Sequence, residues 1–218
     1  MKALRKVKIS WSPNFAYVIG LITTDGNLSP DGRHINFTSK DEELVRLVVD
    51  SLSLTNKIGR KARGYSDDKN YYVVQFGDVI FYKFLTKIGL SPNKSKTLSS
   101  LKIPKKYFFD FLRGHFDGDG TFYSYWDPRW KSSFMFYIEL DSASYNHVVW
   151  LQKRITSLSG IVGRITKSKN TSIYRIKYAK AESLNLLAKM YYNRQVICLS
   201  RKRLKVEKAL AVVDKKLL

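Results

Sequence analysis

The chain has 218 residues, of which 39 are Lys or Arg and 18 are Asp or Glu, giving a formal net charge of +21. This excess predicts a polyanionic partner, and nucleic acid is the commonest polyanion in a cell. Apolar residues make up 44% and aromatic residues 14% of the chain, which is enough to fill a hydrophobic core. This composition excludes a disordered basic tail. We therefore expect a globular protein that binds nucleic acid.

The sequence also argues against a membrane-spanning segment, an internal disulfide and a zinc site. The basic start at residues 1–10 is followed by no apolar segment, and no apolar run is long enough to span a bilayer. We expect a soluble, intracellular protein with no membrane partner, whose compartment (cytoplasm, nucleoid or organelle) stays open. The single cysteine, Cys198, and the scattered His34, His115 and His147 offer no zinc-ligand spacing. Any metal must therefore bind to carboxylates.

Two copies of one plan follow each other along the chain. The first opens with Phe15-Ala-Tyr-Val-Ile-Gly-Leu-Ile-Thr-Thr-Asp-Gly26. The second opens with Phe109-Asp-Phe-Leu-Arg-Gly-His-Phe-Asp-Gly-Asp-Gly120, and the glycines and terminal Asp-Gly fall in register. The repeat predicts an N-terminal half at residues 1–90 and a C-terminal half at residues 106–218, joined by a linker at residues 91–105.

Each copy predicts the order helix, hairpin, helix, hairpin, helix, which is an α+β fold. The opening helix follows Ser12-Pro13, an N-cap with proline in the first turn, and ends at Gly26. Apolar residues at helical spacing predict second helices at residues 41–54 and 144–158. A pair of strands follows each of them.

Strand alternation separates core residues from outward ones. In the strand at residues 33–38, Ile35 and Phe37 share the apolar face, and Ile176 lies on the apolar face of a later strand. An antiparallel sheet with one polar or basic face suits duplex DNA, because a β-ribbon fits the major groove. The predicted DNA contacts are His34, Asn36, Thr38, Gln75, Tyr137, Glu139, Arg175 and Lys177. For any one of them, an ordinary solvated position is an open alternative.

The sharpest signal is the aspartate that ends each opening helix, Asp25 and Asp119. Small residues four positions apart, which allow two helices to approach closely, occur in both: Gly20 and Thr24, and Gly114 and Gly118. If the two helices pack there, both carboxylates meet at helix C-termini, where their charges repel. Mg²⁺ would compensate, because it binds one or two carboxylates together with phosphate oxygens. A lone Asp-Gly usually marks a turn, but the repeated pair predicts a metal site for phosphodiester hydrolysis.

The two helix-end segments resemble the motifs of a known family. Val18-Ile-Gly-Leu-Ile-Thr-Thr-Asp-Gly26 and Leu112-Arg-Gly-His-Phe-Asp-Gly-Asp-Gly120 resemble the two motifs of a single-chain LAGLIDADG homing endonuclease. The resemblance implies a pseudo-twofold duplicated αββαββα homing endonuclease fold, with two antiparallel sheets forming a DNA-binding saddle. It also implies a monomeric Mg²⁺-dependent endodeoxyribonuclease that hydrolyses one phosphodiester on each strand of a long asymmetric double-stranded DNA site, leaving 3′ overhangs. Ca²⁺ is expected to support binding without cleavage.

The resemblance assigns roles to the motif residues. Asp25 and Asp119 match the metal-binding acid, and the carbonyl groups of Thr24 and Gly118 are further candidate ligands. The first acidic position of the motif is kept as Asp117 in the second copy but is a threonine in the first. That position is usually structural in the family, so the departure does not argue against activity.

Family members also place basic and polar residues around the metal ions. The basic catalytic candidates, by position after the last helix of each copy, are Lys94 and Lys202, with Lys96 and Arg201 as close competitors. Phosphate contact or plain solvated charge is an equally open role for each. Ser39 and Ser142 match a polar position that supports the metal ligands.

Two other functions stay open for the same fold. An intron RNA-splicing maturase would bind RNA, and a non-cleaving DNA-binding regulator would usually have lost one motif acid. Both acids are present here, which favours cleavage, although maturases can retain them. Cleavage of plasmid DNA in Mg²⁺, compared with Asp25→Asn and Asp119→Asn, separates the three functions.

Overall fold

A computed structural model describes residues 6–62, 68–169 and 171–217. The chain forms two compact units. The first comprises the chain up to Lys94 together with Leu101–Gly114, and the second comprises Ser95–Ser100 together with the chain from His115 onward. The segment predicted as a linker therefore contributes to both units. No helix in the described ranges is long and apolar enough to cross a membrane.

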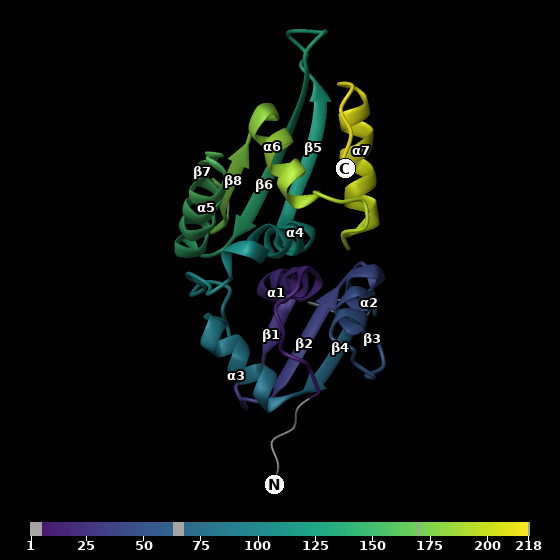
Figure 1. Ribbon diagram of the computed structural model, residues 1–218, viewed down its shortest axis with the longest axis vertical. Coiled ribbons are helices and arrows are strands. Elements are labelled where there is room, and N and C mark those ends of the chain that lie inside the picture. The colour runs from purple at the N-terminus through teal and green to yellow at the C-terminus, as the bar shows by residue number, and fades with distance from the viewer. Residues whose placement is uncertain (1–5, 63–67, 170, 218) are drawn as a thin grey trace. The chain divides into compact units, whose positions relative to one another are not determined.

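The first unit contains a four-stranded antiparallel sheet with strand order β1-β2-β4-β3. Its elements are α1 (Pro13–Asp25), β1 (Gly26–Leu28), β2 (His34–Ser39), α2 (Glu42–Ser51), β3 (Gly59–Lys61), β4 (Tyr71–Gly77) and α3 (Val79–Ile88). Helices α1, α2 and α3 pack on one face of this sheet (Figure 1). Ile35 and Phe37 from β2 and Val74 and Phe76 from β4 are buried beneath them. The opposite face carries the outward residues of the alternating pattern.

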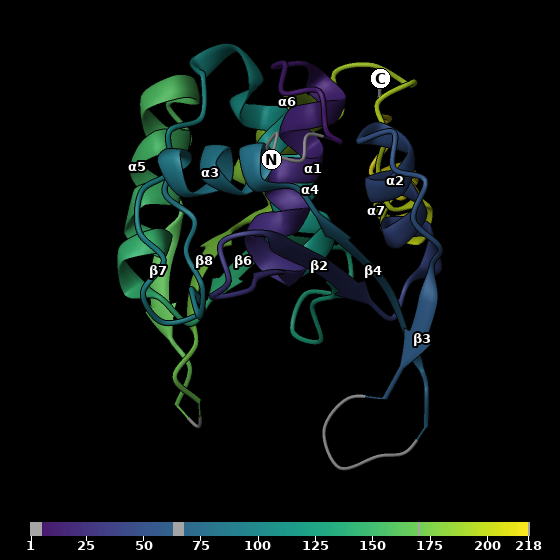
Figure 2. The same cartoon turned by 90° about the horizontal axis from the view of Figure 1, so that it is seen from below.

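The second unit repeats this topology with strand order β5-β6-β8-β7. A 3₁₀ turn (Lys105–Tyr107) leads into α4 (Phe108–Asp119), whose residues divide between the two units. The remaining elements are β5 (Gly120–Trp126), β6 (Phe134–Ser142), α5 (Tyr145–Ser159), β7 (Arg164–Lys167), β8 (Tyr174–Tyr178), α6 (Lys180–Met190) and α7 (Ser200–Ala211). Helices α5 and α6 cover the inner face of the sheet. Figure 2 shows the β7–β8 hairpin reaching beyond α5.

The motif helices begin and pack as their sequences indicate. The Ser12 hydroxyl accepts the Phe15 N–H at 3.2 Å, and Pro13 starts α1 without a lost hydrogen bond. Within the first unit, a Cβ added to Gly114 would lie 2.0 Å from the carbonyl oxygen of Tyr17. Only glycine permits this approach of two backbones. The close contact predicted from the small-residue face therefore occurs at Gly114.

The predicted α+β class and its two antiparallel sheets are confirmed. The structure also contains a helix that the αββαββα plan does not include, α7. Only Val206, Ala209 and Leu210 are buried in it, so its apolar periodicity is too sparse to stand out among its basic residues. The corresponding place in the first copy is a turn around Lys94.

Candidate metal site and nucleic-acid interface

Each motif helix ends in an aspartate and passes into a strand without a loop. Asp25 is the last residue of α1 and Asp119 the last residue of α4, and the glycine that follows each of them begins a strand. A Cβ at Gly26 or Gly120 would lie 2.5 Å or 2.6 Å from the carbonyl oxygen four residues earlier. The glycine of each Asp-Gly pair is therefore required by space, because any larger residue would force the strand away from the helix end.

Lys94 and Lys202 occupy equivalent places in their units. The Lys94 ammonium donates to the carbonyl of Gly26, and the Lys202 ammonium donates to the carbonyl of Gly120 at 2.6 Å. Lys202 also donates to the carbonyls of Phe116 and Asp117, the latter at 2.9 Å. Each cation thus lies at the C-terminal end of a motif helix, where it offsets the partial negative charge of the terminal carbonyls. The glycine whose carbonyl accepts from each lysine directly follows the motif aspartate in the sequence.

The two lysines reach these places by different routes. Lys94 follows Asn93, which adopts the left-handed region at φ 53°, in a turn after α3. Lys202 lies in the first turn of α7. The buried Asp117 accepts the Leu199 N–H at 2.7 Å, directly before that helix. Asp117 therefore anchors α7 and, through it, Lys202.

The contact between Asp117 and Leu199 explains why the first acidic position of the motif is kept in the second copy and replaced in the first. Thr23, its equivalent in the first copy, donates its hydroxyl to the Ile19 carbonyl of its own helix at 2.7 Å. The first unit has a turn rather than a helix at the place of α7, so nothing there needs a carboxylate anchor. At equivalent positions of the two motif helices, Asp117 therefore binds the segment before α7, whereas Thr23 binds only within its own helix.

The available ligands suit a hard cation. Asp25 is half-buried, with the Thr24 hydroxyl 3.5 Å from its Oδ2, and Asp119 is exposed. In the described part of the chain, no three His, Cys, Asp or Glu residues come together in a cluster. Each unit therefore offers one carboxylate with the neighbouring main-chain carbonyls, at Thr24 and at Gly118. Oxygen donors of this number fit Mg²⁺ or Ca²⁺, which complete their shells with water and phosphate, and do not fit zinc.

Ser39 and Ser142 end β2 and β6 and make matching turns. The Ser39 hydroxyl accepts the Asp41 N–H at 3.1 Å, and the Ser142 hydroxyl accepts the Ser144 N–H at 3.1 Å. Both serines therefore direct the chain from a central strand into the next helix. Their predicted support of the metal ligands stays a prediction.

The outward face of the first sheet carries a row of amides. Register places Asn27, Asn36 and Gln75 opposite one another across β1, β2 and β4. None of the three side chains has a hydrogen bond to another described residue. Of the flanking candidates, His34 is bonded to Asp31, and Thr38 is 8% exposed. Asn27 was missed in the sequence, although alternation after Gly26 indicates it.

The charged residues on the outward face of the second sheet are paired with each other. Arg175 donates to both carboxylate oxygens of Asp141, at 2.8 and 3.0 Å, and its Nε lies 3.0 Å from Glu139. The hydrogen bond to Asp141 raises the pKa of Arg175 above its usual value. Lys177 lies 3.7 Å from Glu139, which is 6% exposed. Tyr137 lies beside this group, with Tyr123 and Tyr125, which were not predicted as contacts although they alternate along β5.

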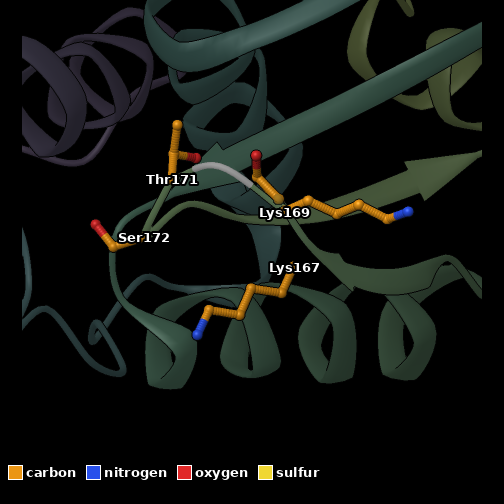
Figure 3. A pocket seen from close by; sticks show the side chains of 5 residues that line it. Lys167, Lys169, Thr171 and Ser172 are labelled. Carbon is orange, nitrogen blue, oxygen red and sulfur yellow. The ribbon is translucent and has the colours of Figure 1, made fainter.

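The tip of the β7–β8 hairpin adds positive charge at the edge of the same unit. Lys167, Ser168, Lys169, Thr171 and Ser172 line an open hollow of about 590 Å³. Figure 3 shows the Lys167 and Lys169 side chains extending in different directions, so their ammonium groups do not converge on one ligand. This tip is suited to scattered phosphate contacts rather than to a built anion site.

A pair of buried histidines lies in the second unit. The Nε2 atoms of His115 and His147 are 3.2 Å apart, and the rings stack with centroids 5.3 Å apart. Burial holds the pKa of His115 well below its ordinary value, with the charges of His147 and Lys202 acting in the same direction. His115 packs in the core of the unit and does not face the outer sheet surface.

The comparison with protein families decides how this arrangement is classified. Residues 12–89 match the family described as the LAGLIDADG-like domain. This part of the chain is similar to a LAGLIDADG domain. This match covers α1, the first sheet and α3, and the second unit repeats the same strand order with its own Asp-Gly helix end. The resemblance stated from the two motifs is confirmed.

Relatives and solved structures extend the comparison to the whole chain. An uncharacterized protein of Methanocaldococcus jannaschii, MJ0398, is 28% identical over 225 residues, covering 96% of this chain and 76% of its own length. The meganuclease I-SmaMI bound to uncleavable DNA has a similar structure, with a TM-score of 0.62, 15% identity, and coverage of 94% of this chain and 92% of its own.

Two further structures share the fold. The homing endonuclease I-DmoI in complex with DNA and Ca has a TM-score of 0.53 and 14% identity, covering 84% of this chain and 91% of its own. The N-terminal LAGLIDADG domain of WhiA has a TM-score of 0.54 and 15% identity, covering 85% of each chain. At these identities, the similarity establishes the fold and leaves the activity to the residues of the site.

Proposed function

We propose that the protein is a site-specific double-strand DNA endonuclease of the homing type. It binds one long asymmetric site as a monomer and hydrolyses one phosphodiester on each strand with Mg²⁺, leaving 3′ overhangs. The two units of one chain supply two different reading faces, so a second copy is not needed to recognise two different half-sites. Sedimentation of the DNA complex tests the stoichiometry, and a dimer required for cleavage would contradict it.

One observation carries this proposal: the aspartate, glycine and lysine at each motif helix end recur in both units. Lys94 contacts the carbonyl of Gly26, and Lys202 contacts that of Gly120, so each unit holds an ammonium one residue from Asp25 or Asp119. A helix end with a carboxylate alone is a common turn. Here both motif helix ends combine a carboxylate with a nearby ammonium group. This combination supports phosphodiester hydrolysis, which needs both a metal ligand and a positive charge near the phosphate.

The roles of the residues follow from their chemistry. Asp25 and Asp119 supply the carboxylate oxygens, and the carbonyls of Thr24 and Gly118 supply further oxygen ligands. A bound divalent cation would activate water and stabilise the charge that develops on the phosphate. Lys94 and Lys202 are positioning residues in this scheme, because their ammonium groups fix the carbonyl that follows each aspartate. Their positive charge also adds to the potential that draws the phosphate backbone to the site.

Double-stranded DNA is the partner that fits both sheet faces. The net charge of +21 supplies attraction that does not depend on sequence, and outward residues on antiparallel strands suit the major groove. The DNA-bound structures of I-SmaMI and I-DmoI support this partner, and the Ca in the I-DmoI complex supports a divalent ion. Affinity should fall steeply with salt, with a slope of about −0.9 per neutralised phosphate. A nearly flat dependence would contradict binding by the two faces.

Cleavage by aspartate variants is the direct test. A plasmid library carrying randomised duplex sites is incubated with the protein and Mg²⁺, and the selected site is then used with Asp25→Asn and Asp119→Asn. We expect double-strand cleavage to fall by about a thousandfold or more in each variant, because metal-assisted charge stabilisation is among the largest catalytic effects. Binding in Ca²⁺ should change far less. Asp50→Asn is the matched control, because Asp50 is an exposed carboxylate near the C-terminal end of α2.

The same experiment separates the alternatives. Sequence-specific duplex binding without cleavage in any divalent cation would favour a DNA-binding regulator, an outcome made relevant by the shared fold of the WhiA domain. Preference for structured RNA over every duplex in the library would favour a splicing maturase. Cleavage at the wild-type rate by either aspartate variant would remove that residue from the proposed metal site.

A further inference from the structure

We infer that the outward face of the second sheet recognises thymine in the major groove through three tyrosines, Tyr123, Tyr125 and Tyr137. The inference rests on the proposed function, since it takes duplex DNA as the ligand of the sheet faces. It adds the chemical class of base that one half-site presents to the protein. Four features of the face lead to it: the ring packing, the bonded hydroxyls, the paired charges and the long hairpin.

The three rings form one nearly parallel cluster. Tyr123 lies directly opposite Tyr137 in the β5–β6 register, with ring centroids 5.3 Å apart and an interplanar angle of 27°. Tyr125 is 6.1 Å from Tyr137 and 6.5 Å from Tyr123, at 19° and 8°. Met135 lies opposite Tyr125, at the outer edge of the cluster. Tyr125 is 42% exposed, so its ring is the part of the cluster most open to a ligand.

The tyrosine hydroxyls are already hydrogen-bonded within the face. Tyr123 donates to Oε1 of Glu139 at 3.0 Å. Tyr125 and Tyr137 are hydrogen-bonded to each other, and this contact raises the pKa of Tyr137. Reading a base with these hydroxyls would require breaking those bonds. What the cluster offers without rearrangement is therefore its ring carbon surface.

The cations of the face are occupied in the same way. Arg175 has both Asp141 and Glu139 as partners. The Lys177 ammonium lies 4.0 Å from the centre of the Tyr137 ring and 5.3 Å from that of Tyr123, in addition to its contact with Glu139. A bidentate contact to guanine would cost these ion pairs and cation–π contacts. Arg175 and Lys177 are therefore poorly placed to bind guanine, which is the commonest base contact of arginine and lysine.

Thymine is the base whose major-groove edge suits such a surface. Every base edge in the groove carries hydrogen-bonding groups, and thymine alone adds an apolar C5-methyl group. Contact of a ring with this methyl buries apolar surface on both sides. Contact with the amino group of cytosine or the carbonyl of guanine would instead desolvate a polar group without a partner.

The hairpin is long enough to carry the rings along a groove. Strands β5 and β6 have 7 and 9 residues, whereas β1 and β2 have 3 and 6. Figure 1 shows the β5–β6 hairpin projecting beyond α5 and α6 of its own unit. A two-stranded ribbon of this kind fits the major groove, so the tyrosines can follow successive base pairs. The first sheet has no equivalent aromatic cluster among its described outward residues.

Deoxyuridine substitution tests the inference directly, because deoxyuridine lacks only the C5-methyl group of thymidine. Sites are first selected from a randomised duplex library by binding in Ca²⁺. We expect thymine at recurring positions of one half-site. Replacing those thymines by deoxyuridine should weaken binding by about fourfold for each contacted methyl group. The same replacement in the other half-site should have little effect.

Variants connect the effect to the cluster. In Tyr125→Ala the penalty for deoxyuridine should fall towards onefold at the thymine that this ring contacts, because the ring is absent, and should remain at thymines that the other two rings contact. Tyr125 is exposed, so its removal leaves the core intact. Tyr145→Ala is the matched control: Tyr145 is another exposed tyrosine of the same unit, at the start of α5. Gln75→Ala, on the first sheet, should keep the full deoxyuridine penalty.

The outcomes are distinct. If the wild-type protein binds no duplex in a sequence-specific way, the proposed function fails and this inference fails with it. If it binds and cleaves, three results would overturn the inference alone. These are a selected site without recurring thymine, an equal deoxyuridine penalty in both half-sites, and an unchanged penalty in Tyr125→Ala.

Discussion

The first sheet presents amides that have no hydrogen bond to another described residue, whereas the second presents tyrosines and charges that are bonded to one another. Asn27, Asn36 and Gln75 form a row in register across three strands of the first sheet. At the second, Arg175 and Lys177 face the solvent side but are engaged by Glu139 and Asp141. Both sheets have the same strand order, so the difference lies in their outward side chains and in the longer β5–β6 hairpin of the second sheet.

The comparison also shows what the two units have in common. The helix end with its Asp-Gly and its lysine is the same in both, and the inner sheet faces are equally apolar. Inward residues must fill a core, and the Asp-Gly turn has no room for a Cβ. Outward residues contribute little to folding, so they are the positions where two copies of one fold can take on different ligands. Substitutions at inward and outward positions can therefore separate folding from recognition.

Both lysines should contribute to stability. Lys202→Met removes the donor for three carbonyls, and we expect the free energy of unfolding to fall by about 3 kcal/mol. Lys94→Met removes the donor for the Gly26 carbonyl, and we expect the free energy of unfolding to fall by at least about 1 kcal/mol. Urea unfolding without metal measures both. Lys167→Met, at the exposed hairpin tip, is the control and should be neutral. Unchanged stability in either variant would contradict the place of that lysine at its motif helix end.

The amide row should carry base-specific discrimination that the paired cations do not. Asn36→Ala or Gln75→Ala should relax the preference at one base pair by about 2 kcal/mol, because asparagine and glutamine bind adenine in a bidentate way. Arg175→Gln should change base preference by less, since its guanidinium is held by Asp141. Repeating the site selection with each variant measures this. A larger loss of specificity in Arg175→Gln would show that its ion pair opens on DNA.

The sequence was sufficient for the fold because its signals were local. The N-cap at Ser12, the Asp-Gly helix ends and the strand alternation around Ile35 each fix a nearby element. Lys94 and Lys202 were also predicted from their position after the last helix of each copy, with Lys96 and Arg201 as close competitors. The acceptors of these lysines were not, because contacts between Lys202 and α4 span more than 80 residues.

The outward face of the second sheet was harder to predict for the same reason. Alternation correctly turned Arg175 and Lys177 outward, and this suggested free basic groups. Their engagement depends on which residue of β6 lies opposite each of them, and a shift of one residue would have changed every partner. Asp141 opposite Arg175 is a fact of tertiary register that no local pattern indicates.

Acid should weaken the second unit through His115. Because burial lowers the pKa of His115, the folded state keeps this residue neutral while the unfolded chain takes up a proton near pH 6.5. The free energy of unfolding should therefore be level above that pH and fall below it, by about 1 kcal/mol between pH 6.5 and 5.5. Urea unfolding across this range measures it. In His115→Gln the slope should be smaller, and an unchanged slope would place the acid sensitivity elsewhere.

The smallest expected effect concerns the stability of the aspartate variants. Asp25 and Asp119 each end a helix, where a negative charge adds to the partial negative charge of the terminal carbonyls. Without metal, Asp25→Asn and Asp119→Asn should keep the free energy of unfolding or raise it by about 0.5 kcal/mol. The gain should be larger for Asp25, because it is half-buried while Asp119 is exposed to screening solvent.

A metal ligand and a structural cap predict opposite signs here. A structural cap would lose stability when its carboxylate is replaced, as Asp117 should, since it accepts the Leu199 N–H. Asp117→Asn is therefore the control within the same helix, with an expected loss of about 1 to 3 kcal/mol. Thermal unfolding without metal and with Mg²⁺ measures all three variants. If Asp25→Asn or Asp119→Asn unfolds as readily as Asp117→Asn, and if added Mg²⁺ stabilises it as much as the wild-type protein, that aspartate maintains the helix end and binds no metal.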